Sequence, residues 1–451
     1  MRRPIIYIGI VGLILLTACS FIANADESSD STNSAAPLSY EVTMESDIVE
    51  FDEYHITIHY PQTPNNQINQ TIIDYVNQRK AAFKKESYQS IQKHGKTKSH
   101  ELHIDFEVLH QGSSFFVVRF EESMDVGLPT LLHAQTIMNF DKKNGKRIEP
   151  DQLFKEDRNY VDQLAELTKE ELMKETGAEV FHSSELQEAL KSSYLENIAL
   201  TTKGIEVYLN QSSEKIPDKI VLGQRSINDL LKEEFASALK AEGESRREKK
   251  TSIEDPPSSK SEKETVVKSQ SDVKKVAITF DDGPHPKVTP EILQVLDEYK
   301  AKATFFMIGK RVNYFPEVAQ RVAEKGHEIG NHTWDHSRLT RLTPEEVDEQ
   351  ISKTQEIIEE VTGVQPEVVR LPFGEQPPIS QKNLQVIPSD VSGENWQGKE
   401  AVELAQDMIN EAKDGDVILL HDLQGSTVEV LELVLDALSR QGYQFVTVSE
   451  L

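Results

Sequence analysis

Cysteine is nearly absent from this chain of 451 residues, and the single one is Cys19. A disulfide needs two thiols, so none links two parts of the chain. Basic residues are also scarce, because 49 Lys and Arg stand against 76 Asp and Glu and give a formal net charge of −27. Nucleic-acid binding depends on basic side chains, so this composition argues against a nucleic-acid partner. The charge is typical of a soluble exported protein.

Long apolar stretches are missing except for residues 5–16, a run too short to span a bilayer easily. Two arginines precede this run, as in a signal peptide, which we place at residues 1–18. The run ends in Leu-Thr-Ala-Cys and resembles the bacterial lipobox, which implies cleavage before Cys19 and a lipid on its sulfur. The expected location is therefore the outer face of the cell membrane. A secretory signal with an incidental cysteine and an uncleaved anchor are the alternatives.

Composition divides the rest of the chain. Residues 19–37 are rich in Ser, Asp, Asn and Ala, as in a flexible tether. Residues 241–272 carry Glu, Lys, Ser and Pro with almost nothing apolar, so they are predicted to be a linker that does not fold. Between them, residues 38–240 combine alternating runs with helical spacing and are predicted to form an α+β domain. Binding of the wall or of a partner is left open as its role.

Histidines are concentrated in this predicted α+β domain, which holds eight of the thirteen. His100 and His103 are candidates for metal ligands, but no acidic or cysteine partner pattern accompanies them. Packed or surface histidines are the better interpretation. We assign no chemistry to this part of the chain.

From residue 273 to the end, predicted strands and helices alternate, which favours a parallel sheet. The predicted strands are residues 276–280, 304–308, 328–329, 368–370, 384–391, 417–420 and 443–448. Polar motifs follow several of these strands directly. The carboxyl ends of the strands are where a (β/α) barrel places its active site.

The first motif is Thr-Phe-Asp-Asp-Gly-Pro at residues 279–284. Neighbouring strand residues point to opposite faces, so Asp281 and Asp282 face the same way only if the strand bends, and the Gly-Pro pair favours a bend. Two carboxylates at a strand end suit one metal ligand and one base. An acidic turn that simply closes a strand is the alternative.

The second motif contains His332 and His336. On a helix or in a tight loop this spacing places both imidazoles on one side, as a metal ion requires. Combined with an aspartate from the first motif, they form a set of two histidines and one carboxylate that leaves coordination positions open.

Three further motifs lie near the ends of later predicted strands: residues 370–373 (Arg-Leu-Pro-Phe), residues 390–396, which end in Asn-Trp, and residues 419–422 (Leu-Leu-His-Asp). The five motifs in this order resemble those of NodB-type polysaccharide deacetylases, carbohydrate esterase family 4. The resemblance covers residues 273–451 and implies a distorted (β/α) barrel with about seven strands. The region before it is similar in layout to the α+β region of PdaC-type peptidoglycan deacetylases and of RsiV anti-sigma factors.

The resemblance also implies a role for each motif residue. Asp282, His332 and His336 would hold a divalent ion, with zinc expected and cobalt or manganese as alternatives. Asp281 would be the general base, with Arg370 pairing with it and fixing its direction, and His421 would be the general acid. Leu420 and Trp396 would form walls of the sugar pocket. The backbone N–H of Phe373 would complete the oxyanion site.

The sequence departs from the family pattern at two places. Asn395 stands where the family usually has an aspartate that tunes the acid histidine, so it keeps the hydrogen bonding but not the charge. Asp390 would replace that charge only if the loop folds back, and a turn role for Asp390 is the alternative. The short segment 376–382 replaces a helix, which changes one wall of the groove.

The function implied by the resemblance is N-deacetylation of cell-wall acetamido sugars: N-acetylmuramic acid or N-acetylglucosamine in peptidoglycan, or chitin oligomers. An O-acetyl esterase that acts on xylan or wall polymers is one alternative. The other is a wall-binding or sensing lipoprotein with a vestigial deacetylase domain.

Overall fold

The structure is a computed structural model that describes residues 40–51, 53–95, 98–128, 131–156, 159–176, 197–209, 217–249, 273–375, 377–381, 383–392, 399–423 and 425–451. The predicted signal peptide, Cys19 and nearly all of the tether and linker lie outside these residues, as do Asn395 and Trp396. Within the described part, no helix is both long and apolar enough to cross a membrane.

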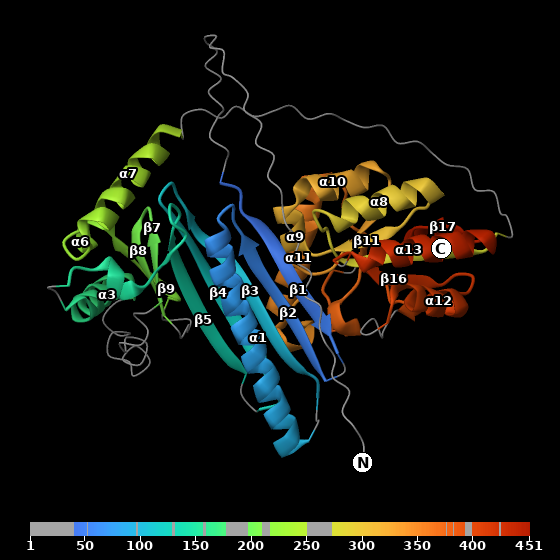
Figure 1. The fold of residues 1–451 in the computed structure, drawn as a ribbon, viewed down its shortest axis with the longest axis horizontal. Helices are drawn as coiled ribbons and strands as arrows, with labels where there is room; N and C mark the ends of the chain where they lie inside the picture. Colours follow the sequence, from blue (N-terminus) through green and yellow to red (C-terminus); the bar gives the residue numbers. More distant parts are fainter. Residues whose placement is uncertain are drawn as a thin grey trace, which may run out of the picture. The chain divides into compact units, whose positions relative to one another are not determined.

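Residues 40–249, here called the N-terminal region, begin with a six-stranded sheet in the order β1-β2-β3-β4-β5-β6 (Figure 1). Its strands are β1 (Thr43–Glu50), β2 (Tyr54–Gln62), β3 (His100–Gln111), β4 (Phe115–Asp125), β5 (Leu132–Asp141) and β6 (Arg147–Ile148). Helix α1 (Asn66–His94) connects the parallel pair β2 and β3. Its buried residues Ile68, Ile72 and Val76 recur every four positions, so one face of the helix packs on the sheet.

A second, three-stranded sheet in the N-terminal region consists of β7 (Ile198–Thr201), β8 (Gly204–Tyr208) and β9 (Lys219–Gly223). Among the described residues of this part, the helices are α2 (Pro150–Leu153), α3 (Tyr160–Thr176), α6 (Gln224–Ile227) and α7 (Glu233–Lys249). Helix α7 extends to Lys249, into the segment predicted as a linker. The reason is local, because its last turns are rich in Glu, Arg and Lys, which are good helix formers.

Residues 273–451, here called the C-terminal region, form a parallel sheet of eight strands, traced from yellow to red in Figure 1. The strands are β10 (Lys275–Gly283), β11 (Thr304–Met307), β12 (Glu328–Asn331), β13 (Val368–Val369), β14 (Gln385–Val386), β15 (Val391–Ser392), β16 (Val417–His421) and β17 (Gln444–Val446). Their order is β14-β13-β12-β11-β10-β16-β15, with β17 also paired to β10. Each pairing is parallel, as the alternating pattern predicts.

The single extended stretch predicted at residues 384–391 is divided between β14 and β15, at opposite ends of the sheet. Val386 and Val391 are five residues apart, so at most about 18 Å of chain joins the two ends. The sheet must therefore curl around until its ends come close, although β14 and β15 do not pair. This is the expected distorted barrel, with eight strands rather than seven.

In the described part of the C-terminal region, six helices pack around this sheet: α8 (Val288–Tyr299), α9 (Gly309–Tyr314), α10 (Pro316–Glu324), α11 (Pro344–Thr362), α12 (Ala401–Glu411) and α13 (Ser426–Arg440). Helix α11 shows why they form where they do. Thr343 and Glu346 make a capping box, Pro344 occupies the first turn, and Gly363 ends the helix in the left-handed conformation.

Both faces of β10 are buried, as expected for a strand in the middle of a parallel sheet. Val276, Ile278 and Phe280 pack in the large cluster under the helices, whereas Ala277 belongs to a small cluster with Phe306. The other members of the small cluster are Val368, Ile387 and Val417, which come from or follow other strands. These side chains fill the sheet's inner face and leave its carboxyl-terminal edge for polar groups.

Candidate active site

The two aspartates lie at the end of β10, where the strand is irregular. Its register with β11 shifts between Phe280 and Gly283, and Asp282 has φ 72°, in the left-handed region that Asp tolerates better than most residues. The bend that the sequence requires is therefore made at Asp282 itself, just before the Gly-Pro pair. It allows both carboxylates to reach the same site.

The two histidines lie in the loop after β12 rather than on a helix, and we call residues 332–338 the metal loop. Thr333 and His336 have φ 65° and 61°, so the loop turns sharply. Its backbone is held by side chains: Thr333 N–H donates to Asn331 Oδ1 at 2.9 Å and Trp334 N–H to Gln350 Oε1 at 2.8 Å. This turn brings both imidazoles to one side, as the sequence predicts for a tight loop.

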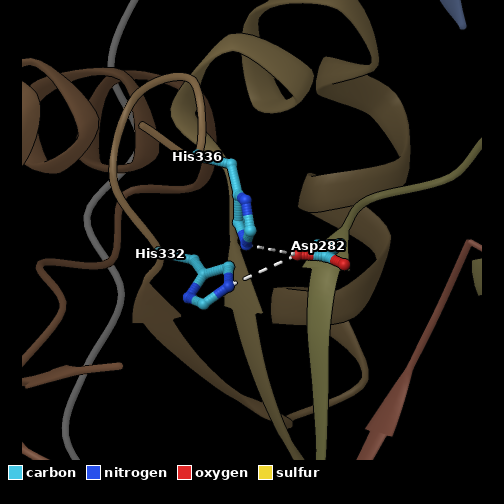
Figure 2. Close-up of side chains that lie close together, drawn as sticks. All are labelled: Asp282, His332 and His336. Carbon is cyan, nitrogen blue, oxygen red and sulfur yellow. Dashed lines mark ion pairs between the residues drawn. The ribbon is translucent and has the colours of Figure 1, made fainter. Parts of the chain in front are cut away.

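Three ligand atoms converge here, as Figure 2 shows. Asp282 Oδ1 lies 3.3 Å from His332 Nε2 and 3.4 Å from His336 Nε2, and all three side chains are buried. Asp282 Oδ1 has no hydrogen-bond donor. An orphaned carboxylate oxygen facing two imidazole nitrogens in a dry site fits a divalent metal ion. The ligand atoms of the three side chains lie within 4.8 Å of one another, close enough to share one ion.

The charges of these residues agree with a cation. Burial lowers the pKa of His336 to about 3, so its ring is neutral, the form that binds metal. Burial has the same effect on His332, but the carboxylates of Asp281 and Asp282 outweigh it and raise the pKa of His332. Burial would raise the pKa of Asp282, yet the neighbouring histidines lower it below its usual value. The site thus favours an ionised Asp282 with positive charge beside it.

Arg370, which directly follows β13, holds Asp281 in place through hydrogen bonds. Its NH1 donates to Asp281 Oδ1 at 2.8 Å and to Thr279 Oγ1 at 2.7 Å, while Nε donates to the carbonyl of Ile387 at 3.2 Å. Arg370 and Asp281 are both buried, so the pair is shielded from water. Asp281 therefore has one oxygen fixed by Arg370 and the other, Oδ2, 3.9 Å from His332 Nε2.

His421 ends β16, and its Cα is the register partner of Asp281 on β10. Both line a cavity of about 230 Å³ together with His332, His336 and Arg370. The remaining residues of the lining are Glu50, Leu371, Phe373, Gly374, Glu375, Val386, Ile387, Pro388, Ser389 and Leu419. The structure therefore brings the predicted base, the predicted acid and both histidine ligands to one cavity, and Asp282 contacts both histidines.

The prediction for Leu420 is wrong, because Leu420 packs in the hydrophobic core and Leu419 lines the cavity instead. Side chains alternate along a strand, so Leu419 shares a face with His421 and Leu420 points away. Phe373 does line the cavity. Its ring stacks on His55 with centroids 4.7 Å apart and meets His336 edge-on at 4.8 Å.

Asp390 has a local structural role. Its Oδ2 accepts a hydrogen bond from Val417 N–H at 2.9 Å, at the start of β16. His421 is at the other end of that strand, about 13 Å away at the usual rise per residue. Asp390 therefore does not replace the missing family aspartate, and the turn role is the correct one. Asn395 and Trp396, and the ends of segment 376–382, lie outside the described residues.

Asp422, the last residue of the fifth motif, is a buried carboxylate with no predicted role. Thr289 donates to its Oδ2 at 2.5 Å, whereas Oδ1 has no partner. Burial raises the pKa of Asp422 from 3.8 to about 7. Between these two pH values the folded state holds a proton at this position that the unfolded state has released.

We expect the free energy of unfolding to fall as the pH rises from 4 to 7, because ionisation of Asp422 stabilises the unfolded state in this range while the folded state keeps the carboxyl protonated. About three pKa units correspond to at most about 4 kcal/mol. The Asp422→Asn variant removes this titration and should flatten the curve. Urea unfolding at several pH values, with a chelator present, measures the slope. The exposed Asp414→Asn is the control, and an equal slope in Asp422→Asn and wild type contradicts the assignment.

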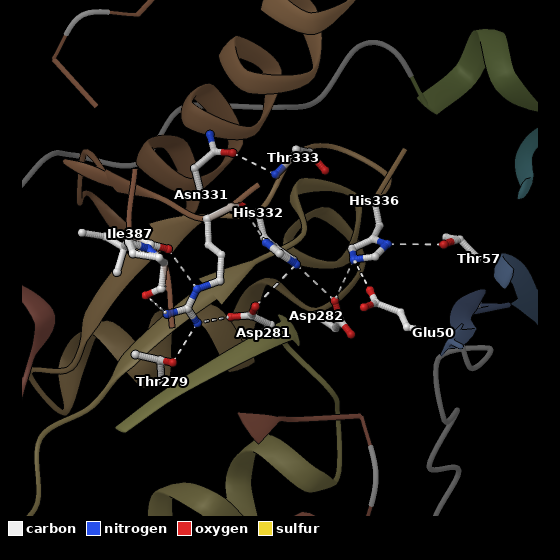
Figure 3. A network of polar contacts seen from close by, with 12 residues as sticks. Glu50, Thr57, Thr279, Asp281, Asp282, Asn331, His332, Thr333, His336 and Ile387 are labelled. Atoms are coloured by element: carbon white, nitrogen blue, oxygen red, sulfur yellow. Dashed lines mark hydrogen bonds and ion pairs between the residues drawn. The ribbon is translucent and has the colours of Figure 1, made fainter. Parts of the chain in front are cut away.

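Three residues of the N-terminal region that lie at this site had no predicted role. Residues 40–451 form one compact unit, and within it Glu50, Thr57 and His55 reach the C-terminal region. Glu50 Oε1 is 3.8 Å from His336 Nε2, and Thr57 Oγ1 is 3.3 Å from His336 Nδ1 (Figure 3). Thr57 and His55 alternate with isoleucines in β2, so the sequence indicates a strand with one polar face. Such a face is equally compatible with exposure to solvent and with contact to another part of the protein.

Comparison with known proteins agrees with this geometry. The family model described as "Polysaccharide deacetylase" matches residues 268–387. The peptidoglycan-N-acetylmuramic acid deacetylase PdaC of Bacillus subtilis is 31% identical over 415 residues, which cover 88% of this chain and 85% of that protein. The peptidoglycan-N-acetylglucosamine deacetylase PgdA of Listeria monocytogenes is 38% identical over 180 residues, 40% of this chain and 39% of that protein.

Among solved structures, that of the peptidoglycan deacetylase PdaC from Bacillus subtilis is 41% identical, with a TM-score of 0.39, and the match covers 40% of this chain and 90% of that one. The decisive finding is the sequence match that extends over most of both chains. The five motifs of the sequence, the place of Asp281, Arg370 and His421 at or directly after strand ends, and this match lead to one conclusion: the chain belongs to the polysaccharide deacetylase family.

Proposed function

We propose that the protein is a divalent-metal-dependent deacetylase that removes acetyl groups from acetamido sugars of cell-wall polysaccharide. The observation that carries this proposal is the convergence of Asp282, His332 and His336, beside a cavity that both histidines line together with the Arg370–Asp281 pair. Unactivated amides are hydrolysed only if water is made nucleophilic, the oxyanion is stabilised and the amine receives a proton. The cavity has a residue for each of these tasks.

Asp281 is the proposed general base, because Arg370 holds one of its oxygens and leaves Oδ2 directed to the metal-binding group. Asp282, His332 and His336 would hold the metal. When bound, the ion would lower the pKa of a water molecule and polarise the acetyl carbonyl. Zinc is the proposed ion, with cobalt and manganese as alternatives, since two imidazoles and a carboxylate suit several divalent metals.

His421 is the proposed general acid, across the strand pair from Asp281. Water adds to the acetyl carbon, the carbon–nitrogen bond breaks, and the proton from His421 goes to the sugar nitrogen, so that acetate and a free amine result. The backbone N–H of Phe373 is proposed to stabilise the oxyanion. Orientation of His421 by Asn395 and stacking of the sugar on Trp396 are proposals from sequence.

Peptidoglycan is the proposed substrate, with N-acetylmuramic acid as the first sugar to test. The relative whose match extends through the N-terminal region is named for N-acetylmuramic acid, whereas the relative named for N-acetylglucosamine matches only 40% of this chain. Glu50 of the N-terminal region lines part of the cavity, so similarity in this region is relevant to which sugar the cavity accepts. Chitin oligomers are the further candidates.

The decisive experiment is acetate release by the purified protein from peptidoglycan, chitin oligomers and acetylxylan, with and without a chelator. We expect acetate from peptidoglycan and none once the metal is removed. Mass spectrometry of the digested glycan then shows whether N-acetylmuramic acid or N-acetylglucosamine has lost its acetyl group. Acetate from acetylxylan alone would identify an O-acetyl esterase. Metal binding without turnover on any of the three would favour a wall-binding or sensing lipoprotein.

An extracytoplasmic location follows from the same substrate. We propose that residues 1–18 are a signal peptide and that Cys19 carries a lipid anchor. Residues 19–37 would then tether the two domains, residues 38–240 and 273–451, to the membrane, so that both domains face the wall. Labelling of cells with a lipid precursor tests the anchor. We expect the wild type to be labelled and the Cys19→Ser variant to remain unlabelled. Equal labelling of both would exclude Cys19 as the attachment site.

A further inference from the structure

The two metal-binding histidines are held by different parts of the chain. His332 Nδ1 bonds the carbonyl of Arg370 at 2.7 Å, inside the C-terminal region. A carbonyl only accepts, so Nδ1 carries the proton and Nε2 faces Asp282. His336 Nδ1 bonds Thr57 Oγ1 at 3.3 Å, and Thr57 belongs to β2 of the N-terminal region (Figure 3).

A hydroxyl is a suitable partner for that second histidine. An imidazole that binds metal through Nε2 must be neutral and keep its proton on Nδ1, which then needs an acceptor. Thr57 is 2% exposed and His336 is 1% exposed, so water has little access to either. Without the hydroxyl, Nδ1–H would be a buried donor with no acceptor, and the orientation of the ring would no longer be fixed.

His59, on the same face of β2, supports the backbone before His336. Its Nε2 donates to the carbonyl of Asp335 at 3.0 Å, so its neutral ring accepts at Nδ1, where Ser46 Oγ lies at 2.7 Å. Ser46 in turn accepts from Arg311 NH1 at 2.5 Å. The chain of donors runs from the C-terminal region through Ser46 and His59 and back to the metal loop.

Further hydrogen bonds and apolar packing join the N-terminal region to the C-terminal region. Arg338 of the metal loop bonds His55 Nδ1 at 2.6 Å, so the three polar residues of this β2 face, His55, Thr57 and His59, all contact the loop. Lys310 bonds the carbonyl of Phe106 at 2.6 Å. Three apolar residues of α9, α10 and the position between them join the hydrophobic cluster of the six-stranded sheet, namely Tyr314, Phe315 and Val318.

We propose that the N-terminal region is a working part of the metal site, with Thr57 as a positioning residue that orients the ligand His336 and His59 as the support of the metal loop. This inference rests on the metal site of the proposed function. It assigns chemistry to a region whose histidines had no partner pattern in the sequence. Loss of an outer partner of a metal-binding histidine typically lowers metal affinity by about 10- to 100-fold.

The test compares full-length variants at position 57. Thr57→Val replaces the hydroxyl by a methyl group of similar size, and Thr57→Ser keeps the hydroxyl. We expect zinc affinity, measured by competition with a chromophoric chelator, to fall by about 10- to 100-fold in Thr57→Val and to be restored in Thr57→Ser. Thr168→Val is the matched control, because Thr168 is equally buried in the N-terminal region and bonds only the Leu164 carbonyl of its own helix α3.

The outcomes separate this inference from the proposed function. Zinc binding that is equal in wild type, Thr57→Val and Thr168→Val would refute the role of Thr57 and leave the metal-dependent function intact. Wild type that binds no divalent ion would refute the function itself. A similar loss in Thr57→Val and Thr168→Val would show a general loss of stability, and would also count against a specific role for Thr57.

Discussion

The Asp281→Asn variant should lose about 100- to 10,000-fold in the rate of deacetylation and still bind the metal ion. The amide has the same shape and keeps an oxygen that accepts from Arg370, so the geometry of the pair is preserved. It cannot take a proton at neutral pH, and that is the task proposed for Asp281. Single-turnover kinetics on a peptidoglycan fragment measures the chemical step, and chelator competition measures the metal.

A neutral residue 281 leaves the buried Arg370 without its counter-charge, which lowers stability. Thermal unfolding at the assay pH therefore accompanies the kinetics, and the rate is compared only under conditions in which the variant is folded. Asp390→Asn is the control, since its side chain keeps an acceptor for Val417 N–H and lies away from the metal group. An Asp281→Asn enzyme with nearly full activity would require another base.

Removal of a ligand should have the second large effect. We expect His336→Ala to lower zinc affinity by more than about 100-fold and to abolish activity at the metal concentrations that saturate wild type, because only Asp282 and His332 of the set remain. Both quantities should fall together, which distinguishes a ligand from a residue that acts on substrate alone.

His133→Ala is the matched control, because His133 is an exposed histidine of β5 in the six-stranded sheet. It should bind metal and release acetate as wild type does. Deacetylation that survives both chelation and the loss of His336 would rule out the metal mechanism. It would then leave the convergence of the three buried side chains without a chemical purpose.

Much of the site was predictable because it depends on local patterns. Asp281, Asp282 and Arg370 follow short β-branched runs, and parallel strands bring their carboxyl ends to one edge whatever the length of chain between them. The spacing of His332 and His336 needed only a turn. The positive φ values that make this turn come from the hydrogen bonds around the loop, which no pattern of residues reveals.

The errors have physical causes of two kinds. Leu420 was assigned by its place in a motif, although alternation from His421 already pointed to Leu419. The division of the stretch 384–391 into β14 and β15 was not predictable in this way, since it follows from closure of the sheet. The same is true of Thr57 and His59, because a polar strand face looks alike whether water or another part of the protein covers it.

The hydrogen bond between Thr57 and His336 joins residues 279 positions apart, and this distance has a consequence for how the chain changes over evolution. A catalytic half that depended only on itself could be recombined freely with other partners. Here a C-terminal region joined to another protein would keep its predicted metal ligands but lack Thr57, the acceptor for His336. We therefore expect the two halves to be inherited together, and substitutions in β2 and in the metal loop to arise as compensating pairs.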